Sequence, residues 1–463
     1  MDKDDIDPTT PNAITFREAF RTWARIAALS FGGPAGQIAV MHRILVDEKH
    51  WIGETRFLHA LNYCMLLPGP EAHELAIYIG WLLHRIRGGI LAGMLFVLPG
   101  IVVLGTLSWI YAAFGHIGTV QGLFFGLKCA VLAIVLEAMI RVSKRALKSP
   151  ALIIIAVLAF IGIFFFALPF PAIILGAALA GYVGTRFNLD WFKPAARSES
   201  GEEDSTALID RAFAREIPAH VRPSFARFAL VALIGGAIWL GPLALCFVIL
   251  GPANVFTAIA GFNAKMAIVT FGGAYAILAY MAQEAVQHYH WLNPGEMLVG
   301  LGFAETTPGP LICVVQFVGF MAAFRAPGAL SPAFAGTIGG LLAAWSTFVP
   351  PFIWIFLGGP YVEALIGNRA LNGALSAITA AVVGVIANLA IWLALHTLFG
   401  HVAEVHAFGL SVSVPALRTI SLSAVFISLA AVIAIFRFKI GMLPVLAAAS
   451  AIGMIYYLTG GHA

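Results

Sequence analysis

The feature that most constrains this chain is a series of long apolar stretches that carry very few charged residues. Thirteen of them approach or exceed the roughly 20 residues of helix that cross a hydrocarbon core about 30 Å thick. They lie at about 23–45, 57–83, 88–114, 121–140, 150–167, 170–185, 227–250, 257–281, 295–323, 333–357, 371–399, 413–436 and 440–458. Backbone groups in lipid must find hydrogen-bond partners within their own segment. The sequence therefore predicts an all-α polytopic membrane protein.

Composition and motifs exclude several classes of protein. Hydrophobic residues make up 60% of the chain and charged residues 11%, against roughly 25% charged residues in soluble domains. No GxxxxGK[ST], HExxH or GxSxG pattern occurs, so neither an ATP-driven pump nor a membrane-embedded hydrolase has a supporting motif. The four cysteines stand singly and the paired histidines lack a third ligand, so we expect no metal and no cofactor. We also expect a lipid bilayer around the chain and no nucleic-acid partner.

The charged residues divide the chain into parts. Residues 1–190 form a first transmembrane repeat with an amphipathic N-terminal helix, and 191–225 form a charged, solvated linker. Residues 226–255 form an extra transmembrane helix, and 256–463 form a second repeat. Basic clusters predict that the N-terminus and the linker are cytoplasmic. One connection, which holds Arg43, Lys49 and Arg56, would then be external and disagrees with this topology.

Three motifs recur at a constant spacing, which indicates an internal duplication. Phe31-Gly32-Gly33 recurs as Phe271-Gly272-Gly273, His50-Trp51 as His290-Trp291, and Pro68-Gly69-Pro70 as Pro308-Gly309-Pro310, each 240 positions later. Beyond an 11-residue insertion near Arg325 the offset becomes 251. Seven predicted segments, an odd number, separate the starts of the two repeats. The sequence therefore predicts an inverted repeat.

The Gly and Pro motifs interrupt segments that hydropathy predicts to be helical. Secondary transporters with inverted repeats bind substrate where such broken helices meet, because half-helix N-termini present free N–H groups to an anion. Gly allows the backbone to turn, and Pro begins the next helix. The alternative is that these residues only kink or closely pack membrane helices. We favour a binding site, with these candidate residues: Phe31, Gly32, Gly33, Pro34, Gln37, Pro68, Gly69, Pro70, Phe271, Gly272, Gly273, Pro308, Gly309 and Pro310.

Ionisable residues within membrane segments are costly and usually functional. Lys128 and Arg25 are candidates for the positive charge of the site. The alternatives are that Lys128 extends its side chain toward the membrane surface and that Arg25 lies on an anionic leaflet with Arg17 and Arg21.

Four acidic or basic side chains flank the Pro-Gly-Pro motifs and could carry protons in a proton-coupled transporter: Glu71, His73, Glu74 and Glu305. The alternative is simpler for the first of them. Glu71 and Glu74 directly follow Pro70, where negative charge stabilises the start of a helix.

The motifs together resemble the chromate ion transporter (CHR) family in its two-domain form. The resemblance is carried by FGGPAGQ at 31–37, LLPGP at 66–70, GGILAGMLFVLPG at 88–100, GLK at 126–128 and the second-half FGG and PGP. It implies an inner-membrane secondary transporter that exports chromate and confers chromate resistance. Ala274 and Ile277 depart from the first half's Pro34 and Gln37. A carrier of sulfate or another oxyanion, for which chromate is a mimic, and a passive channel stay open as alternatives, as does a homodimer.

Overall fold

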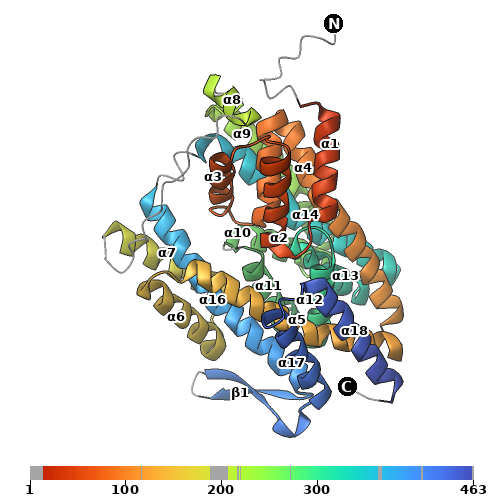
Figure 1. Cartoon of the computed structure of the whole chain (residues 1–463). Helices are drawn as coiled ribbons and strands as arrows, with labels where there is room; N and C mark the ends of the chain where they lie inside the picture. The colour runs from red at the N-terminus through yellow and green to blue at the C-terminus, as the bar shows by residue number, and fades with distance from the viewer. Residues whose placement is uncertain are drawn as a thin grey trace.

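The computed structural model describes residues 14–115, 117–187, 207–215, 218, 220–271, 273–362, 368–407 and 410–460. Their regular structure is almost entirely helical, as predicted (Figure 1). The exception is a small antiparallel hairpin of β1 (Val402–Ala407) and β2 (Leu410–Pro415), in which Val402 pairs with Pro415. The all-α prediction missed this hairpin, because most of it lies between the predicted spans 371–399 and 413–436 and its last residues fall inside the second of them.

The first repeat begins with a helical hairpin. Helix α1 (Phe16–Leu29) starts at a Thr15 cap, and α2 (Gly33–His42) continues into a π-helical turn, η2 (Arg43–Glu48). The Lys49 ammonium lies 2.8 Å from Glu18, and the Arg25 guanidinium lies 2.6 Å from Glu48. The end of η2 therefore lies beside α1, and Ser30, Phe31 and Gly32 form the tip of the hairpin.

A second hairpin follows, with Pro68-Gly69-Pro70 at its tip. It consists of α3 (Glu54–Cys64) and the first part of α4 (Glu71–Phe114). Helix α4 reverses at His84 and Arg85, whose φ/ψ values of −131/31 and 54/−149 are not helical. The two parts of α4 then pack backbone to backbone, because a Cβ on Gly88 would lie 2.1 Å from the carbonyl oxygen of Gly80.

The second repeat has the same order of elements. It comprises α10 (Val255–Val269), α11 (Ala274–Gln283), η4 (Glu284–His288), α12 (Pro294–Thr306), η5 (Leu311–Cys313), α13 (Val314–Arg325) and α14 (Pro332–Gly358). A π-helical turn ends the second helix in both repeats. His50 and His290, 240 positions apart, have φ values of 51° and 52°. The duplication therefore extends to unusual backbone conformations.

These hairpins correct part of the sequence prediction. Four predicted single spans are wrong, because each contains two helices that fold back at a Gly or Pro break: 23–45, 57–83, 257–281 and 295–323. The fold-back also resolves the disagreement over charge. Arg43, Lys49 and Arg56 follow α2 or begin α3, so they lie at the same end of the hairpins as the start of α1. These three basic residues then lie on the same side as Arg17 and Arg21 of α1, as the positive-inside rule expects.

The remaining helices form a second layer, which we call the six-helix bundle. It consists of α5 (Gly118–Ala146), α6 (Pro150–Phe166), α7 (Phe170–Arg186), α16 (Arg369–Leu398), α17 (Leu422–Phe436) and α18 (Met442–Leu458). Short 3-10 turns η6 (Gly359–Tyr361) and η7 (Leu417–Thr419) precede α16 and α17. In Figure 1 the bundle lies below the hairpins of the first repeat.

The two repeats exchange helices within this bundle. Helix α5 packs on α18, and its counterpart α16 packs on α7. A Cβ on Gly122 would lie 2.8 Å from the carbonyl oxygen of Gly453, and one on Gly373 would lie 2.9 Å from that of Gly181. Gly122 and Gly373 differ by the 251 positions of the repeat. Each half therefore contributes helices that pack on the other half, rather than folding as an independent domain beside it.

Part of the predicted linker is packed rather than solvated. Helix α8 (Leu208–Arg215) docks on the connection between η2 and α3. The N–H groups of Leu208 and Ile209 donate to the carbonyls of His50 and Trp51 at 3.1 and 3.0 Å, and Ile209 is fully buried. The Asp210 carboxylate accepts from the Gly53 N–H at 2.7 Å and pairs with Arg56. The linker residues 188–206 lie outside the described part.

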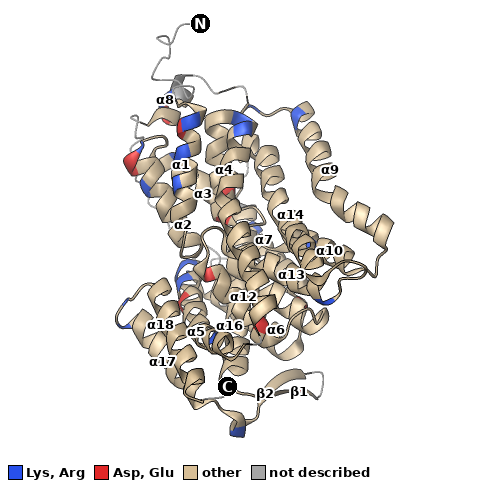
Figure 2. Ribbon diagram, turned by 90° about the vertical axis from the view of Figure 1, so that its right-hand side faces the viewer, with Lys and Arg blue, Asp and Glu red and all other residues tan. Residues whose placement is uncertain are grey.

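Helix lengths agree with a multi-pass membrane protein. Within the described residues, five helices are long and apolar enough to cross a membrane: α4, α5, α9 (Phe225–Leu250), α14 and α16. Helix α9 packs on α10 and α14 only along one side and exposes most of its apolar surface, with Leu233 73% exposed. Figure 2 shows Lys and Arg mainly near helix ends, while the long helices are uncharged over most of their length.

The linker also contains a pH-sensitive contact at His220. Its ring packs edge-on against Trp81 at 5.2 Å. Burial, and then the positive charges of Arg85 and Arg227, lower the pKa of His220 to about 4. The docked segment therefore binds fewer protons than the free segment, whose histidine has a pKa of about 6.5. This contribution to docking is complete above about pH 6.5 and is lost as the pH falls toward 4.

We expect the contact to loosen between pH 7.5 and pH 5. Spin labels on Ser224→Cys and Arg87→Cys, in a chain without its native cysteines, should give a narrow distance distribution at pH 7.5 and a broader one at pH 5. In the His220→Asn variant the distribution should not change with pH. An equal change with and without His220 would contradict the assignment of this pH dependence to the histidine.

Candidate functional site

The tips of hairpins from opposite repeats meet in the interior. The Gly309 N–H donates to the carbonyl of Ser30 at 2.9 Å. The side-chain amide of Gln37, which is 1% exposed, donates to the Gly309 carbonyl at 2.5 Å. The Phe-Gly-Gly break of the first repeat is thus fastened to the Pro-Gly-Pro break of the second.

The reciprocal pair of breaks is also in contact. A Cβ on Gly273 would lie 3.0 Å from a carboxylate oxygen of Glu71, which directly follows Pro70. A Cβ on Gly33 would lie 3.4 Å from the hydroxyl of Tyr275 in the second repeat. The four predicted breaks are therefore brought together, although Gly272 lies outside the described residues.

The backbone at these tips requires glycine. Gly32, Gly33, Gly69, Gly273 and Gly309 have φ values of 85°, 70°, 148°, 89° and 108°, in the region that side chains with a Cβ avoid. Sequence motifs that hydropathy alone would place inside helices are therefore sites where the chain turns.

The helices that begin at the breaks have uncapped N-termini. No side chain caps α2, α11, α4 or η5, which start directly after the four breaks. Helices α3, α5, α7, α9, α14 and α18 also lack a side-chain cap, whereas α10, α12 and α16 begin with asparagine caps. Pro34 occupies the first turn of α2, while Pro70 and Pro310 directly precede α4 and η5. Orphan N–H groups and positive helix ends therefore face the region where the tips meet.

Several titratable side chains beside the breaks are buried without a partner. Within the described part of the chain, both carboxylate oxygens of Glu74 and both ring nitrogens of His73 have no hydrogen-bond partner, and each residue is 0% exposed. The His73 ring lies among Phe96, Phe348 and Phe352. Glu305 accepts one hydrogen bond from the Tyr275 hydroxyl at 3.4 Å and leaves its other oxygen unpartnered.

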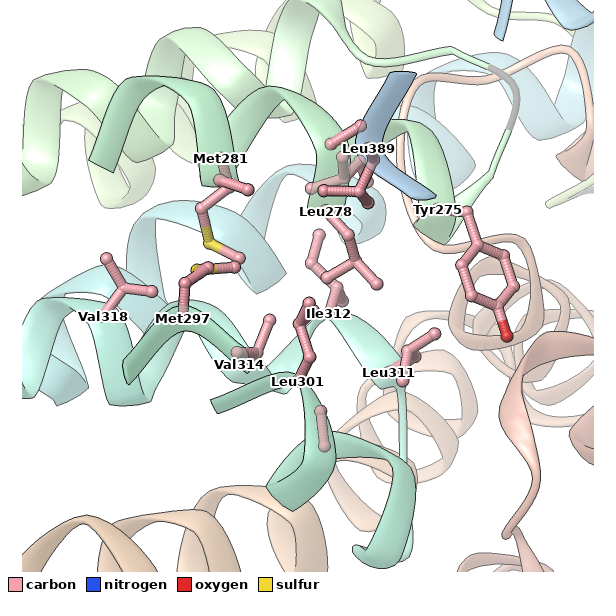
Figure 3. Close-up of a cluster of buried hydrophobic side chains, with 14 of the residues drawn as sticks. Tyr275, Leu278, Met281, Met297, Leu301, Leu311, Ile312, Val314, Val318 and Leu389 are labelled. Atoms are coloured by element: carbon pink, nitrogen blue, oxygen red, sulfur yellow. The ribbon is translucent and has the colours of Figure 1, made fainter. Parts of the chain in front are cut away.

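A large apolar cluster supports this region on the side of the second repeat. Helices α11, α12 and α13 pack through side chains that include Leu278, Leu301 and Val314. Figure 3 shows Tyr275 at one end of this cluster, with its hydroxyl directed away from the apolar side chains. The cluster thus holds α11 so that the Tyr275 hydroxyl lies at the breaks. Tyr275 was not predicted as a site residue, because its first-repeat counterpart is Ala35 and gives no signal.

The two predicted cations do not lie at the breaks. Arg25 is paired with Glu48 at the surface of the first hairpin. Lys128 directs its ammonium toward Gly295, where a Cβ would lie 2.9 Å away. Gly295 is at the start of α12, and Thr306 at its other end adjoins the break, about 16 Å away at 1.5 Å per residue. The Lys128 side chain therefore extends away from the region where the tips meet.

Two arginines near the end of α5 carry positive charge that acts on side chains at the breaks. Arg141 acts electrostatically on Glu305 and Tyr275, and Arg145 acts on Glu71. Arg141 is also paired with Glu137, one turn earlier on α5. From the sequence alone, basic residues at this helix end indicate topology only. Their repeat counterparts, Trp392 and His396, show that the second half does not repeat these charges.

Comparison with known proteins identifies the family. The model described as "Chromate transporter" matches residues 17–182 and 257–454. The chain belongs to the chromate transporter family. The two matched stretches correspond to α1–α7 and α10–α18, so the family unit is present twice. The resemblance that the sequence motifs carry is thereby confirmed.

Individual relatives of this chromate transporter family member agree. A chromate transport protein of Pseudomonas aeruginosa is 31% identical over 82% of each chain. One from Cupriavidus metallidurans is 28% identical over 83% of this chain and 84% of its own. An uncharacterized transporter of Bacillus subtilis matches 32% of this chain but 77% of its own length, at 28% identity. No solved structure matches the chain.

The family and the fold indicate a transporter rather than an enzyme. Within the part of the chain that the structure describes, no three His, Cys, Asp or Glu residues are grouped as metal ligands. What the family and the fold support jointly is a multi-pass membrane transporter with an oxyanion as its class of substrate.

Proposed function

We propose that this protein exports chromate across the inner membrane and thereby confers chromate resistance. The observation that carries the proposal is the convergence of four uncapped helix starts on one buried region. Backbone N–H groups at helix N-termini bind tetrahedral oxyanions without needing a dedicated cation. The relatives from Pseudomonas aeruginosa and Cupriavidus metallidurans are named for chromate transport, which supports chromate as the cargo.

The direction of transport follows from the charge of the cargo. A potential of 100 mV, negative inside, favours the exit of a dianion by about 4.6 kcal/mol, twice the value for one charge. Efflux can therefore be driven by the membrane potential alone, whereas uptake would need a coupled ion. This argument supports export.

We further propose that the two repeats insert in opposite senses. If the hairpins at the breaks do not cross the membrane, the crossing elements between them are the second part of α4, then α5, α6, α7 and α9. Five is an odd number, so the second copy is inverted. This arrangement supports alternating access around a site at the repeat interface. The inner membrane is the corresponding location, with the linker in the cytoplasm. A homodimer is compatible with the exposed apolar face of α9.

The test is chromate flux into or out of proteoliposomes under an imposed potential, with and without a pH gradient. We expect saturable flux toward the positive side, weakly inhibited by excess sulfate. Strong sulfate inhibition at equal concentration would favour the general oxyanion carrier, and flux that never saturates would favour a channel. The absence of potential-driven chromate movement would contradict the proposal.

We propose a proton-linked role for Glu71, His73, Glu74 and Glu305. A dianion beside several buried carboxylates is strongly disfavoured unless those groups carry protons. The missing partners of Glu74 and Glu305 support this proposal. Binding of the oxyanion would then be linked to protonation of the carboxyl groups that face it.

The Glu305→Gln variant tests this link. Glutamine keeps the shape of a protonated glutamic acid, so we expect chromate flux within about threefold of wild type at pH 6. In the wild type the flux should fall as the pH rises from 6 to 8, and in the variant it should fall less steeply, because Glu71, His73 and Glu74 remain. The measurement is initial flux at fixed potential over this pH range, and Glu404→Gln, in the β-hairpin, is the control. Retention of the full pH dependence in Glu305→Gln would contradict a role for this residue.

A further inference from the structure

Equivalent helices of the two repeats are buried to very different degrees. Every residue of α11 from Ala274 to Ala282 is buried, and so is every residue of α12 from Met297 to Glu305. In α2 only Gly33, Gln37 and Met41 are buried. Leu298 is 0% exposed, whereas Leu58, its counterpart in α3, is 44% exposed. Helices α2 and α11 are similarly apolar, so for that pair the difference lies in what covers them, whereas α3 is also more polar than α12.

The six-helix bundle covers the second-repeat hairpins. Helix α12 packs on α5, α16 and α18, and α11 packs on α16. Leu127 of α5 contacts Gly302 so closely that a Cβ on that glycine would lie 2.6 Å from it. The Phe170 ring of α7 stacks on Tyr280 of α11 at 4.9 Å.

The first-repeat hairpins lack this cover. In the two repeats α12 corresponds to α3, α11 to α2, α5 to α16 and α18 to α7. The counterparts of these contacts are therefore α3 against α16, α5 and α7, and α2 against α5. Within the described residues, none of these pairs forms a packed interface; α2 and α3 pack on α1, η2 and α4 instead. The six-helix bundle therefore packs on the hairpins of the second repeat and leaves those of the first repeat uncovered.

We propose that this asymmetry is one of two states, and that the exposed face of α2 and α3 is the surface on which the bundle closes in the other. The occupant of that face is the α5–α16 layer of this same chain. Because the halves are related by the repeat, the contact between Leu127 and Gly302 predicts its counterpart in the alternate state: Ile378 against Asn62. When this contact forms, the contact of Leu127 with Gly302 opens.

In the two states the breaks are reached from opposite sides of the protein. In the present state the bundle leaves uncovered the side of the start of α1, and the basic end of α5 acts on the breaks, so in this proposal an anion approaches the tips past Arg141 and Arg145. In the alternate state the same tips would be reached from the side of the η4–α12 connection. The inference concerns motion and does not depend on which oxyanion is carried.

Cysteine pairs test the proposal in a chain whose four native cysteines are replaced by alanine. The pair Leu127→Cys/Gly302→Cys should cross-link in the present state, and Asn62→Cys/Ile378→Cys should cross-link in the alternate state. Leu58→Cys/Val248→Cys, which joins an exposed position of α3 to an exposed position at the far end of α9, outside the bundle, is the control pair and should not react. Each cross-link should stop flux, and reduction should restore it.

Single cysteines give a second measurement that needs no pair to form. Leu58→Cys should react with an impermeant maleimide from one side of the membrane only, and locking the Asn62/Ile378 pair should protect it. Leu298→Cys should be unreactive until that lock exposes it from the opposite side. A functional carrier in which Asn62/Ile378 never cross-links and Leu298→Cys is never labelled would overturn the proposal. If both states are trapped but chromate flux is absent, the proposed cargo fails and this inference stands.

Discussion

Replacing Gly33 with leucine is expected to reduce oxyanion flux by about 100-fold or more, because small displacements of positioning groups have effects of that size. Gly33 has a φ of 70°, which costs a residue with a Cβ about 1–2 kcal/mol. Its Cβ would also lie 3.4 Å from the Tyr275 hydroxyl, and a leucine side chain would extend further into the region where the tips meet. Flux in proteoliposomes, normalised to the amount of inserted protein, measures the effect.

A matched control separates this effect from general disturbance of a membrane helix. Gly236 of α9 has no atom within 4 Å of its Cβ position and has a helical backbone, so Gly236→Leu should leave flux within about twofold. Gly33→Ala should be intermediate, since it introduces the backbone strain without the bulk. A Gly33→Leu protein with more than half of the wild-type flux would exclude the breaks as the site.

The breaks could be predicted from the sequence because a duplication supplies its own comparison. Phe31-Gly32-Gly33 alone is compatible with a kinked helix. The same motif 240 positions later, at the same distance from Pro-Gly-Pro, indicates a shared function. What the sequence could not predict was the path between motifs. Both arms of a hairpin are apolar, so a hydropathy window over 23–45 cannot distinguish one crossing from a fold-back.

The charged residues were harder to predict for a different reason. Lys128 lies deep in an apolar segment, but depth does not say where a long flexible side chain points, and here it extends to Gly295. Arg141 and Arg145 lie at a helix end, where basic residues are common for topological reasons alone. Comparison of the repeats does distinguish these two arginines. Their counterparts are Trp392 and His396, so the positive charges are specific to the first half.

We therefore expect Arg141 and Arg145 to attract the anion, in place of Lys128 and Arg25, which are the candidates from the sequence. A charge near a protein surface acts on a dianion by a few kcal/mol at contact and less at longer range, so we expect Arg141→Gln or Arg145→Gln to raise KM about tenfold. The effect should shrink at high ionic strength, because salt screens partly exposed charges. Initial flux as a function of chromate concentration at 50 and 500 mM salt measures it.

The same assay decides between the two sets of cations. Lys128→Gln and Arg25→Gln should each change KM less than about twofold, as should Arg418→Gln, an exposed arginine next to the β-hairpin. A tenfold increase in KM in Lys128→Gln, with no change in Arg141→Gln, would show that Lys128, the candidate from the sequence, attracts the anion. Because Arg141 and Arg145 lie on the side where α2 and α3 are uncovered, their loss should raise KM for chromate loaded on that side more than for chromate loaded on the other. Arg141 and Arg145 would then attract the oxyanion in one access state only, and would not be part of the site that holds it in both states.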